Sequence, residues 1–207
     1  MDYRTKEEKV ADYLREGIIS GTYPRGSRLK QAEIAEQLNL SITPVREALK
    51  LLEAEGYITR DSYRGASVVP FDADASEEIL QLRLILEARL VQAAVENAST
   101  VDIEELYVIE EEFERAFSSG DRAAARGINY RFHRRLYDIS EQPHTLHFVQ
   151  ILWARYPFDV INAVGGREDN AIQEHKEILH ALAARDSQAA VMAMRKHIES
   201  GWDVLKT

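Results

Sequence analysis

Three side chains suited to DNA, Thr43, Arg46 and Lys50, follow one another at intervals of three and four residues. Residues at this spacing lie on the same face of an α-helix. A guanidinium can bind a guanine edge or a phosphate in bidentate fashion. The sequence therefore predicts a helix face that contacts the phosphates and base edges of a nucleic acid.

The stretch from Leu38 to Ile58 has the pattern needed to position such a face. Ser41 or Thr43 can cap the helix, and Pro44 fits its first turn, where the missing N–H costs nothing. Gly56 suits the left-handed position that ends a helix. The opposite face carries an apolar stripe at helical spacing: Val45, Ala48, Leu49 and Leu52. We interpret this stretch as the turn and second helix of a helix-turn-helix, followed by a strand.

The segments around this helix complete a winged helix-turn-helix. Periodicity and turn residues predict helices over 6–20 and 31–38, and strands over 57–60 and 66–69 around a tip at 61–65. We therefore expect a DNA-binding domain at residues 1–70 and a linker at 71–75.

The rest of the chain, residues 76–207, shows no strand pattern and predicts an all-α domain. Six helices are expected, at about 75–97, 101–118, 121–139, 143–156, 167–184 and 187–205. The predicted fold class is mainly α, with an N-terminal winged helix-turn-helix and a C-terminal six-helix bundle.

Composition narrows the class of protein. The chain has no cysteine, no apolar run of the roughly 20 residues that a membrane span needs, and a charged N-terminus unlike a signal peptide. We therefore expect a cytoplasmic protein without membrane contact. The net charge of −9 is uneven, because residues 1–70 carry 11 basic and 11 acidic residues, whereas the remainder carries 15 and 24. A neutral DNA domain binds weakly as a monomer, so we expect a homodimer that doubles the phosphate contacts.

The motif Ser-x-Thr-Pro-Val-Arg-Glu-Ala-Leu at Ser41–Leu49, with Glu55-Gly56 and the wing pair Arg64-Gly65, resembles the winged-helix domain of the GntR family of bacterial transcription regulators. The remainder is similar to the FCD ligand-binding domain of the FadR-like branch, and six helices favour its VanR-type subgroup. The segments that carry this second resemblance are Arg83-x-x-x-Glu87, Asn129-x-x-Phe132-His133, Glu174-His175-x-x-Ile178-Leu179 and Asp186 to His197.

The resemblance implies contacts with double-stranded operator DNA at five residues: Ser41, Thr43, Arg46, Arg64 and Gly65. One position departs from the family, because Ile42 stands where many relatives have arginine. Isoleucine donates no hydrogen bond but can contact a thymine methyl, so we expect a different operator. The alternative for Arg46 is a surface ion pair with Glu47 on an ordinary helix.

The resemblance also implies a divalent metal site. FCD domains commonly bind a metal through an Asp or Asn and three histidines, which correspond here to Asn129, His133, His175 and His197. Asn129 and His133 share a helix face, and each other histidine lies on its own predicted helix. Such a donor set suits Zn²⁺ or Ni²⁺. The alternative is that these are ordinary core or surface histidines, and Asn129 replaces the usual Asp.

Three imidazoles and an amide leave the full charge of the metal uncompensated, which favours an anionic ligand. The resemblance implies that this ligand is a small carboxylate effector, because a small organic acid often completes the coordination in relatives. Arg83 is the candidate second contact with the effector, although it can instead pair with Glu87 four residues later. Tyr130, Trp153 and Arg155 could line the same pocket, although aromatic residues at such positions more often belong to the core.

These features predict a ligand-responsive transcription regulator that is not an enzyme. One alternative is a metal-dependent enzyme with an appended DNA-binding domain, for which Glu174 is the only obvious general base. The sequence has no His-Glu-x-x-His, phosphate-binding glycine loop or Gly-x-Ser-x-Gly motif to support it. A weaker alternative is a winged helix that contacts only protein.

Overall fold

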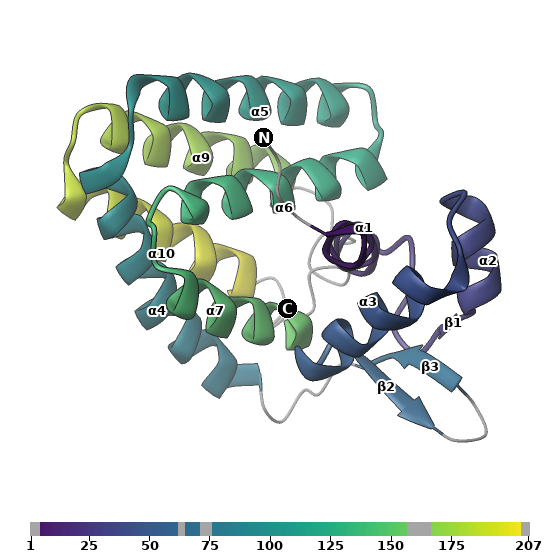
Figure 1. The fold of residues 1–207 in the computed structure, drawn as a ribbon. Coiled ribbons are helices and arrows are strands. Elements are labelled where there is room, and N and C mark those ends of the chain that lie inside the picture. Colours follow the sequence, from purple (N-terminus) through teal and green to yellow (C-terminus); the bar gives the residue numbers. More distant parts are fainter. Residues whose placement is uncertain (1–4, 62–64, 71–75, 157–166, 204–207) are drawn as a thin grey trace.

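The N-terminal part of the chain is a three-helix unit with a small sheet (Figure 1). The computed structural model describes residues 5–61, 65–70, 76–156 and 167–203, so the predicted linker at 71–75 lies outside the described residues. The sheet is antiparallel with strand order β1-β3-β2. The elements in chain order are α1 (Lys6–Ile19), β1 (Arg28–Leu29), α2 (Gln31–Gln37), α3 (Ile42–Ala54), β2 (Ile58–Asp61) and β3 (Gly65–Val68).

Helix α3 begins and ends largely as its sequence predicts. Its apolar stripe packs against α1, and Val45, Ala48, Leu49 and Leu52 are all fully buried. Gly56 has a φ of +82°, and the N–H of Tyr57 bonds to the carbonyl of Leu52 at 2.9 Å, which closes the last turn. The predicted cap is wrong in one detail, because Ser41 occupies the N-cap position but its side chain makes no capping hydrogen bond.

Strand β1 is the element that the sequence did not predict. It consists of Arg28 and Leu29, which pair with Ser67 and Ala66 of β3. Two residues are too short to show the alternation by which a strand is recognised. The two predicted strands are present as β2 and β3, with Ile58 opposite Val68.

The C-terminal part is the predicted all-α bundle, and six helices are described in it. Helix α10 packs along α4 and α9, whereas α5 packs against α6 and α9, and α7 packs against α4. Figure 1 shows α5, α9 and α6 stacked above the level of α7. The helices are α4 (Ser76–Asn97), α5 (Thr100–Ser118), α6 (Arg122–Asp138), α7 (Pro143–Arg155), α9 (Arg167–Ala183) and α10 (Ser187–Asp203).

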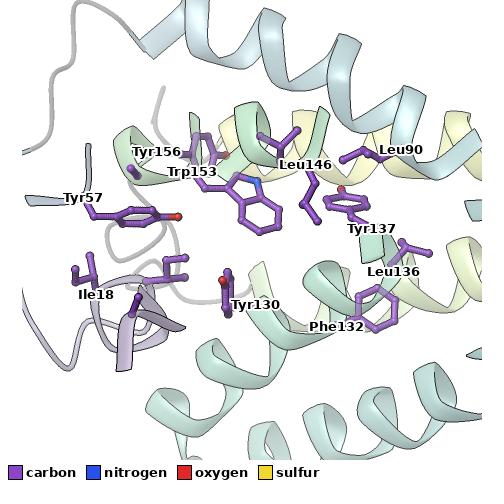
Figure 2. Packing of buried hydrophobic residues seen from close by; sticks show 14 of the residues in the cluster. Ile18, Tyr57, Leu90, Tyr130, Phe132, Leu136, Tyr137, Leu146, Trp153 and Tyr156 are labelled. Atoms are coloured by element: carbon purple, nitrogen blue, oxygen red, sulfur yellow. The ribbon is translucent and has the colours of Figure 1, made fainter. Parts of the chain in front are cut away.

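The two parts share one apolar core. Figure 2 shows Ile18 and Tyr57 of the N-terminal part near Tyr130, Trp153 and Tyr156 of the bundle, and all five belong to the same buried cluster. Helix α1 packs against α6 at this junction. The contact between the two parts therefore excludes water and involves the same helix, α1, that supports α3.

Polar contacts cross the same junction. Arg25, in the turn after α1, donates to the carbonyl of Tyr156 at 2.6 Å, and Arg126 of α6 donates to the carbonyl of Ser20. Both acceptors are backbone oxygens at helix ends, where carbonyls have no partner within their own helix. These bonds hold the end of α1 and the end of α7 against the opposite part of the chain.

Candidate functional site

The predicted DNA-contacting face of α3 is open to solvent. Thr43, Arg46 and Lys50 are exposed on the side opposite the buried stripe, and Ile42 beside them is 51% exposed. Arg46 does contact Glu47, with Nε and Oε1 3.4 Å apart, and Lys50 pairs with the same carboxylate at 2.9 Å. Because these ion pairs are solvated, they bind weakly and leave both cations able to turn toward a phosphate.

The wing lies next to this face. Gly65 opens β3 with a φ of +74°, a conformation that favours glycine, and Arg64 lies outside the described residues. Arg60 of β2 donates from Nη2 to the carbonyl of Arg46 at 3.1 Å and pairs with Glu53. Arg60 thus connects the wing to α3, a contact between two elements that no sequence spacing indicates.

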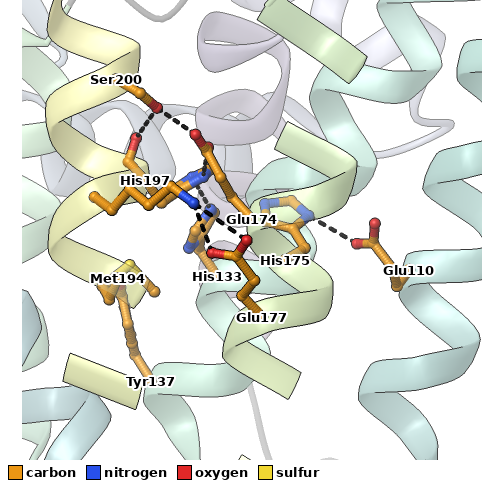
Figure 3. Close-up of polar contacts among 10 residues, drawn as sticks. Glu110, His133, Tyr137, Glu174, His175, Glu177, Met194, His197 and Ser200 are labelled. Atoms are coloured by element: carbon orange, nitrogen blue, oxygen red, sulfur yellow. Dashed lines mark hydrogen bonds and ion pairs between the residues drawn. The ribbon is translucent and has the colours of Figure 1, made fainter. Parts of the chain in front are cut away.

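Three of the predicted metal ligands meet inside the bundle (Figure 3). His133 of α6, His175 of α9 and His197 of α10 are buried, and one candidate ligand atom from each lies within 4.8 Å of the others. The Nε2 atoms of His133 and His197 are 3.0 Å apart. Two ligands of a tetrahedral Zn²⁺, with bonds of about 2.0–2.1 Å, are roughly 3.3 Å apart, so this spacing suits one shared ion.

Buried carboxylates orient two of these rings. The Nδ1 of His175 lies 2.7 Å from Oε2 of Glu110, and the Nδ1 of His197 lies 2.9 Å from Oε2 of Glu174. Each carboxylate favours the tautomer with the proton on Nδ1, which leaves Nε2 with a lone pair for a metal. Ser200 donates to the other oxygen of Glu174 at 2.6 Å. Glu174 is therefore an orienting group rather than the free general base that the enzyme alternative needs.

Glu110 is the functional residue that the sequence did not reveal. It lies on α5, 65 residues from His175, and only the packing of α5 on α9 brings the two together. Burial, with a contribution from the charge of Glu114, raises the pKa of Glu110 to about 8. A cation at His175 would oppose this shift and favour the ionised carboxylate.

Asn129 is the fourth member of the donor set that the resemblance implies. It lies one turn before His133 on α6 and lines the same small cavity as His133 and His197. Its Oδ1 is buried and accepts no hydrogen bond from the described residues. A buried amide oxygen without a donor is costly unless something else binds it. Three imidazole nitrogens and this oxygen therefore fit a borderline divalent ion.

The cavity beside the histidines has a volume of about 30 Å³. Arg83 lines it and also pairs with Glu87, with Nε and Oε1 2.6 Å apart, so the ion pair that was the alternative reading is present. Its guanidinium lies 4.0 Å from the centre of the Tyr156 ring. The residues that line the cavity are Ile19, Arg83, Asn129, Tyr130, His133, Trp153 and His197.

Comparison with known proteins decides the family. The model of the bacterial regulatory proteins of the gntR family matches residues 6–68, and that of the FCD domain matches residues 78–200. The HTH-type transcriptional regulator McbR of Escherichia coli K12 is 31% identical over 186 residues, which cover 87% of this chain and 83% of McbR. This chain belongs to the GntR family and carries an FCD domain.

Other relatives of this GntR-family regulator agree. YdhC of Bacillus subtilis, also named an HTH-type transcriptional regulator, is 29% identical over 200 residues, covering 93% of this chain and 88% of YdhC. The solved structure of E. coli McbR/YncC has a TM-score of 0.85 at 26% identity and covers 98% of both chains. Because the family and these relatives are transcriptional regulators, the enzyme alternative is set aside.

Two further observations concern the helices of this GntR-family regulator and the residues that line its cavity. Among the residues that the structure describes, no helix is long and apolar enough to cross a membrane. Tyr130 and Trp153, two of the three side chains that could line the pocket, do line the cavity, whereas Arg155 lies beside Gly56 instead. Among the described residues of the N-terminal part, Ile19 alone lines the cavity, and no sequence pattern indicates this.

Proposed function

We propose that this GntR-family regulator binds double-stranded operator DNA as a homodimer and that a small carboxylate changes its operator affinity from within the bundle. The observation that carries the ligand-binding half is the cavity that His133, His197 and Asn129 share with Arg83. A site with metal-binding side chains and a guanidinium selects an anion. The proposed place of action is the cytoplasm, where bacterial operator DNA lies.

The DNA-binding half rests on α3 and the wing. The exposed hydroxyls of Ser41 and Thr43 and the guanidinium of Arg46 belong to the face opposite the buried stripe. We assign them, with Arg64 and Gly65 of the wing, to operator contacts. A hydroxyl at the start of a helix that caps no N–H, as at Ser41, can bind a phosphate instead.

The proposed metal site rests on its set of donor atoms. His133, His175 and His197 would hold the ion by their Nε2 atoms, with Asn129 as the fourth ligand, and Zn²⁺ or Ni²⁺ suits this set. A bound divalent ion would supply a positive charge and a coordination position for a carboxylate oxygen. Glu110 and Glu174 keep the rings of His175 and His197 in the required tautomer, and Arg83, which also lines the cavity, would bind the anion.

The regulator responds to the carboxylate only if the ligand binds one arrangement of the DNA-binding part better than another. The shared core and the contacts of α1 with α6 give a direct route for such a preference.

The test of the DNA-binding half uses Arg46→Ala and an operator selected from genomic DNA with the wild-type protein. We expect the variant to lose at least about tenfold in operator affinity, because a guanidinium–base or guanidinium–phosphate contact is removed on each protomer. Fluorescence anisotropy measures it. Arg115→Ala, which removes an exposed guanidinium from α5 in the bundle, should bind like wild type. Wild-type affinity in Arg46→Ala would reject the assignment of α3.

A further inference from the structure

One wall of the cavity belongs to the DNA-binding part. Ile19, the last residue of α1, is 5% exposed and lines the cavity beside six residues of the bundle. Its hydrocarbon side chain faces the same space as His133, Arg83 and Trp153. A molecule in this cavity therefore touches the proposed ligand-binding residues and the DNA-binding part at once.

The size of the cavity determines whether such a molecule can enter without displacing part of the wall. At about 30 Å³ it has room for about two water molecules, since one buried water needs about 10–15 Å³ in this measure. Acetate, with four heavy atoms, is larger than two waters. A carboxylate can enter only if part of the wall moves away, and protein interiors are too closely packed to absorb this without a displacement.

The bundle side of the wall is held by many contacts. Arg83 and Trp153 both hydrogen-bond to Glu87, whose other oxygen accepts from Tyr137 at 2.5 Å. His197 is fixed by Glu174. These groups are buried and lie on helices that pack against one another, so moving any of them breaks several hydrogen bonds in a region of low dielectric.

Ile19 is held less firmly. Its side chain makes only apolar contacts, and α1 ends immediately after it, at Ser20 and at Gly21 with a φ of +82°. Arg126 of α6 donates a hydrogen bond to the carbonyl of Ser20, directly after Ile19. Unlike Arg83, Trp153 and His197, Ile19 can therefore move without breaking a side-chain hydrogen bond.

Movement of α1 passes to the DNA-contacting helix. Arg15 of α1 binds Glu55, the C-cap of α3, in bidentate fashion at 2.8–2.9 Å through Nη2 and 3.0 Å through Nε, and the pair is almost buried. Leu14 of α1 and Leu49 of α3 are fully buried in the same core. The two helices thus form one rigid unit.

We propose that Ile19 limits the size of the carboxylate and transmits its binding, because a ligand larger than the cavity must displace Ile19 and with it α1 and α3. This inference rests on the proposed function, since it concerns the same cavity. According to this proposal, the DNA-binding part forms one wall of the ligand site through Ile19. Short carboxylates then bind with little displacement, and longer ones bind more weakly but move α1 further.

The test compares wild type, Ile19→Ala and Ile18→Ala, each with Zn²⁺ added, in calorimetric titrations with acetate and butyrate. Ile18 is the matched control, because it is equally buried on α1 but does not line the cavity. We expect wild type to prefer acetate, and Ile19→Ala to bind butyrate about tenfold more tightly than wild type, since removed side-chain volume admits the longer chain. Ile18→Ala should match wild type within about twofold.

The second measurement is amide hydrogen exchange in residues 14–23, at the end of α1 and in the turn that follows it. Butyrate should increase exchange there in wild type and in Ile18→Ala, but not in Ile19→Ala, although this variant binds more butyrate. If Ile19→Ala is too unstable, Ile19→Val should shift the butyrate affinity in the same direction by a smaller factor. Two results would overturn the role of Ile19 while leaving the proposed function standing. One is an equal butyrate affinity in all variants, and the other is a butyrate-induced increase in exchange in Ile19→Ala as large as that in wild type. If no variant binds either carboxylate, the proposed effector class is wrong and the inference falls with it.

Discussion

Each of the three buried histidine rings has a hydrogen-bond contact that fixes its orientation. His175 and His197 meet carboxylates through Nδ1, and His133 faces His197 through Nε2 at 3.0 Å. Two unprotonated nitrogens at this distance repel each other unless a proton or a cation lies between them. A metal ion satisfies all three rings together, and the buried oxygen of Asn129 as well.

The ligand assignment predicts that His133→Ala and His175→Ala lose bound metal. Each removes one of three imidazoles, and an amide with two imidazoles holds a divalent ion weakly. Metal content after purification and buffer exchange, measured by plasma mass spectrometry, should fall from about one ion per chain to near zero. His180→Ala serves as the control, because His180 is an exposed histidine of the same helix as His175. Equal metal content in all four proteins would contradict the site.

The role of Glu174 is tested by Glu174→Gln. Losing the carboxylate weakens the orientation of His197, so metal affinity should fall by about 10–100-fold, as for other groups that orient a metal-binding histidine. Glu177→Gln is the matched control, because Glu177 lies one turn further along α9 and pairs with Lys196 at the surface. Competition with a chromophoric chelator gives both affinities. A similar loss in the two variants would mean that Glu174 acts through net charge and not through His197.

The sequence could indicate the three histidines but not their partners. His133, His175 and His197 correspond to family motifs, whereas Glu110 and Ile19 enter the site only through the packing of α5 on α9 and of α1 on the bundle. Periodicity shows which face of a helix is buried, but it does not show which helix that face meets.

At the scale of the elements, α1 joins α3, the proposed DNA-contacting helix, to the bundle. Its C-terminal end contributes Ile19 to the cavity, and Arg15, one turn earlier, binds the C-cap of α3. The helices themselves follow from caps, apolar spacing and glycine positions, and the described boundaries lie within two residues of the predicted ones. The strand β1 and the contacts of α1 with α6 cannot be predicted in this way, because neither leaves a periodic pattern in the sequence.

The Arg15–Glu55 pair should contribute strongly to stability. Glu55→Ala removes one partner of a pair in which the arginine side chain is 5% exposed, which leaves a buried charge less compensated. Asp12 remains in contact with Arg15, so we expect a loss near the lower end for such pairs, about 3 kcal/mol in the free energy of unfolding. Urea titration followed by circular dichroism measures it. Lys196→Ala, which breaks a surface pair, should leave the midpoint unchanged.

At the scale of the whole molecule, charge is divided between the two parts. Residues 1–70 are neutral overall, and the net charge of −9 belongs to the remainder. DNA therefore meets a neutral module with a few exposed cations, attached to an acidic bundle that it repels. Such a module gains little from general attraction to DNA, and its affinity depends on a small number of phosphate contacts.

This division predicts how binding depends on salt. The logarithm of the affinity falls linearly with the logarithm of salt concentration, with a slope set by the number of phosphates neutralised. If the regulator binds as a dimer, a DNA with two half-sites should show about twice the slope of a DNA with one half-site, because both modules then contact phosphates. Anisotropy titrations at about 50–200 mM salt measure both slopes. Equal slopes would mean that one module binds alone, and the homodimer would then have no part in operator recognition.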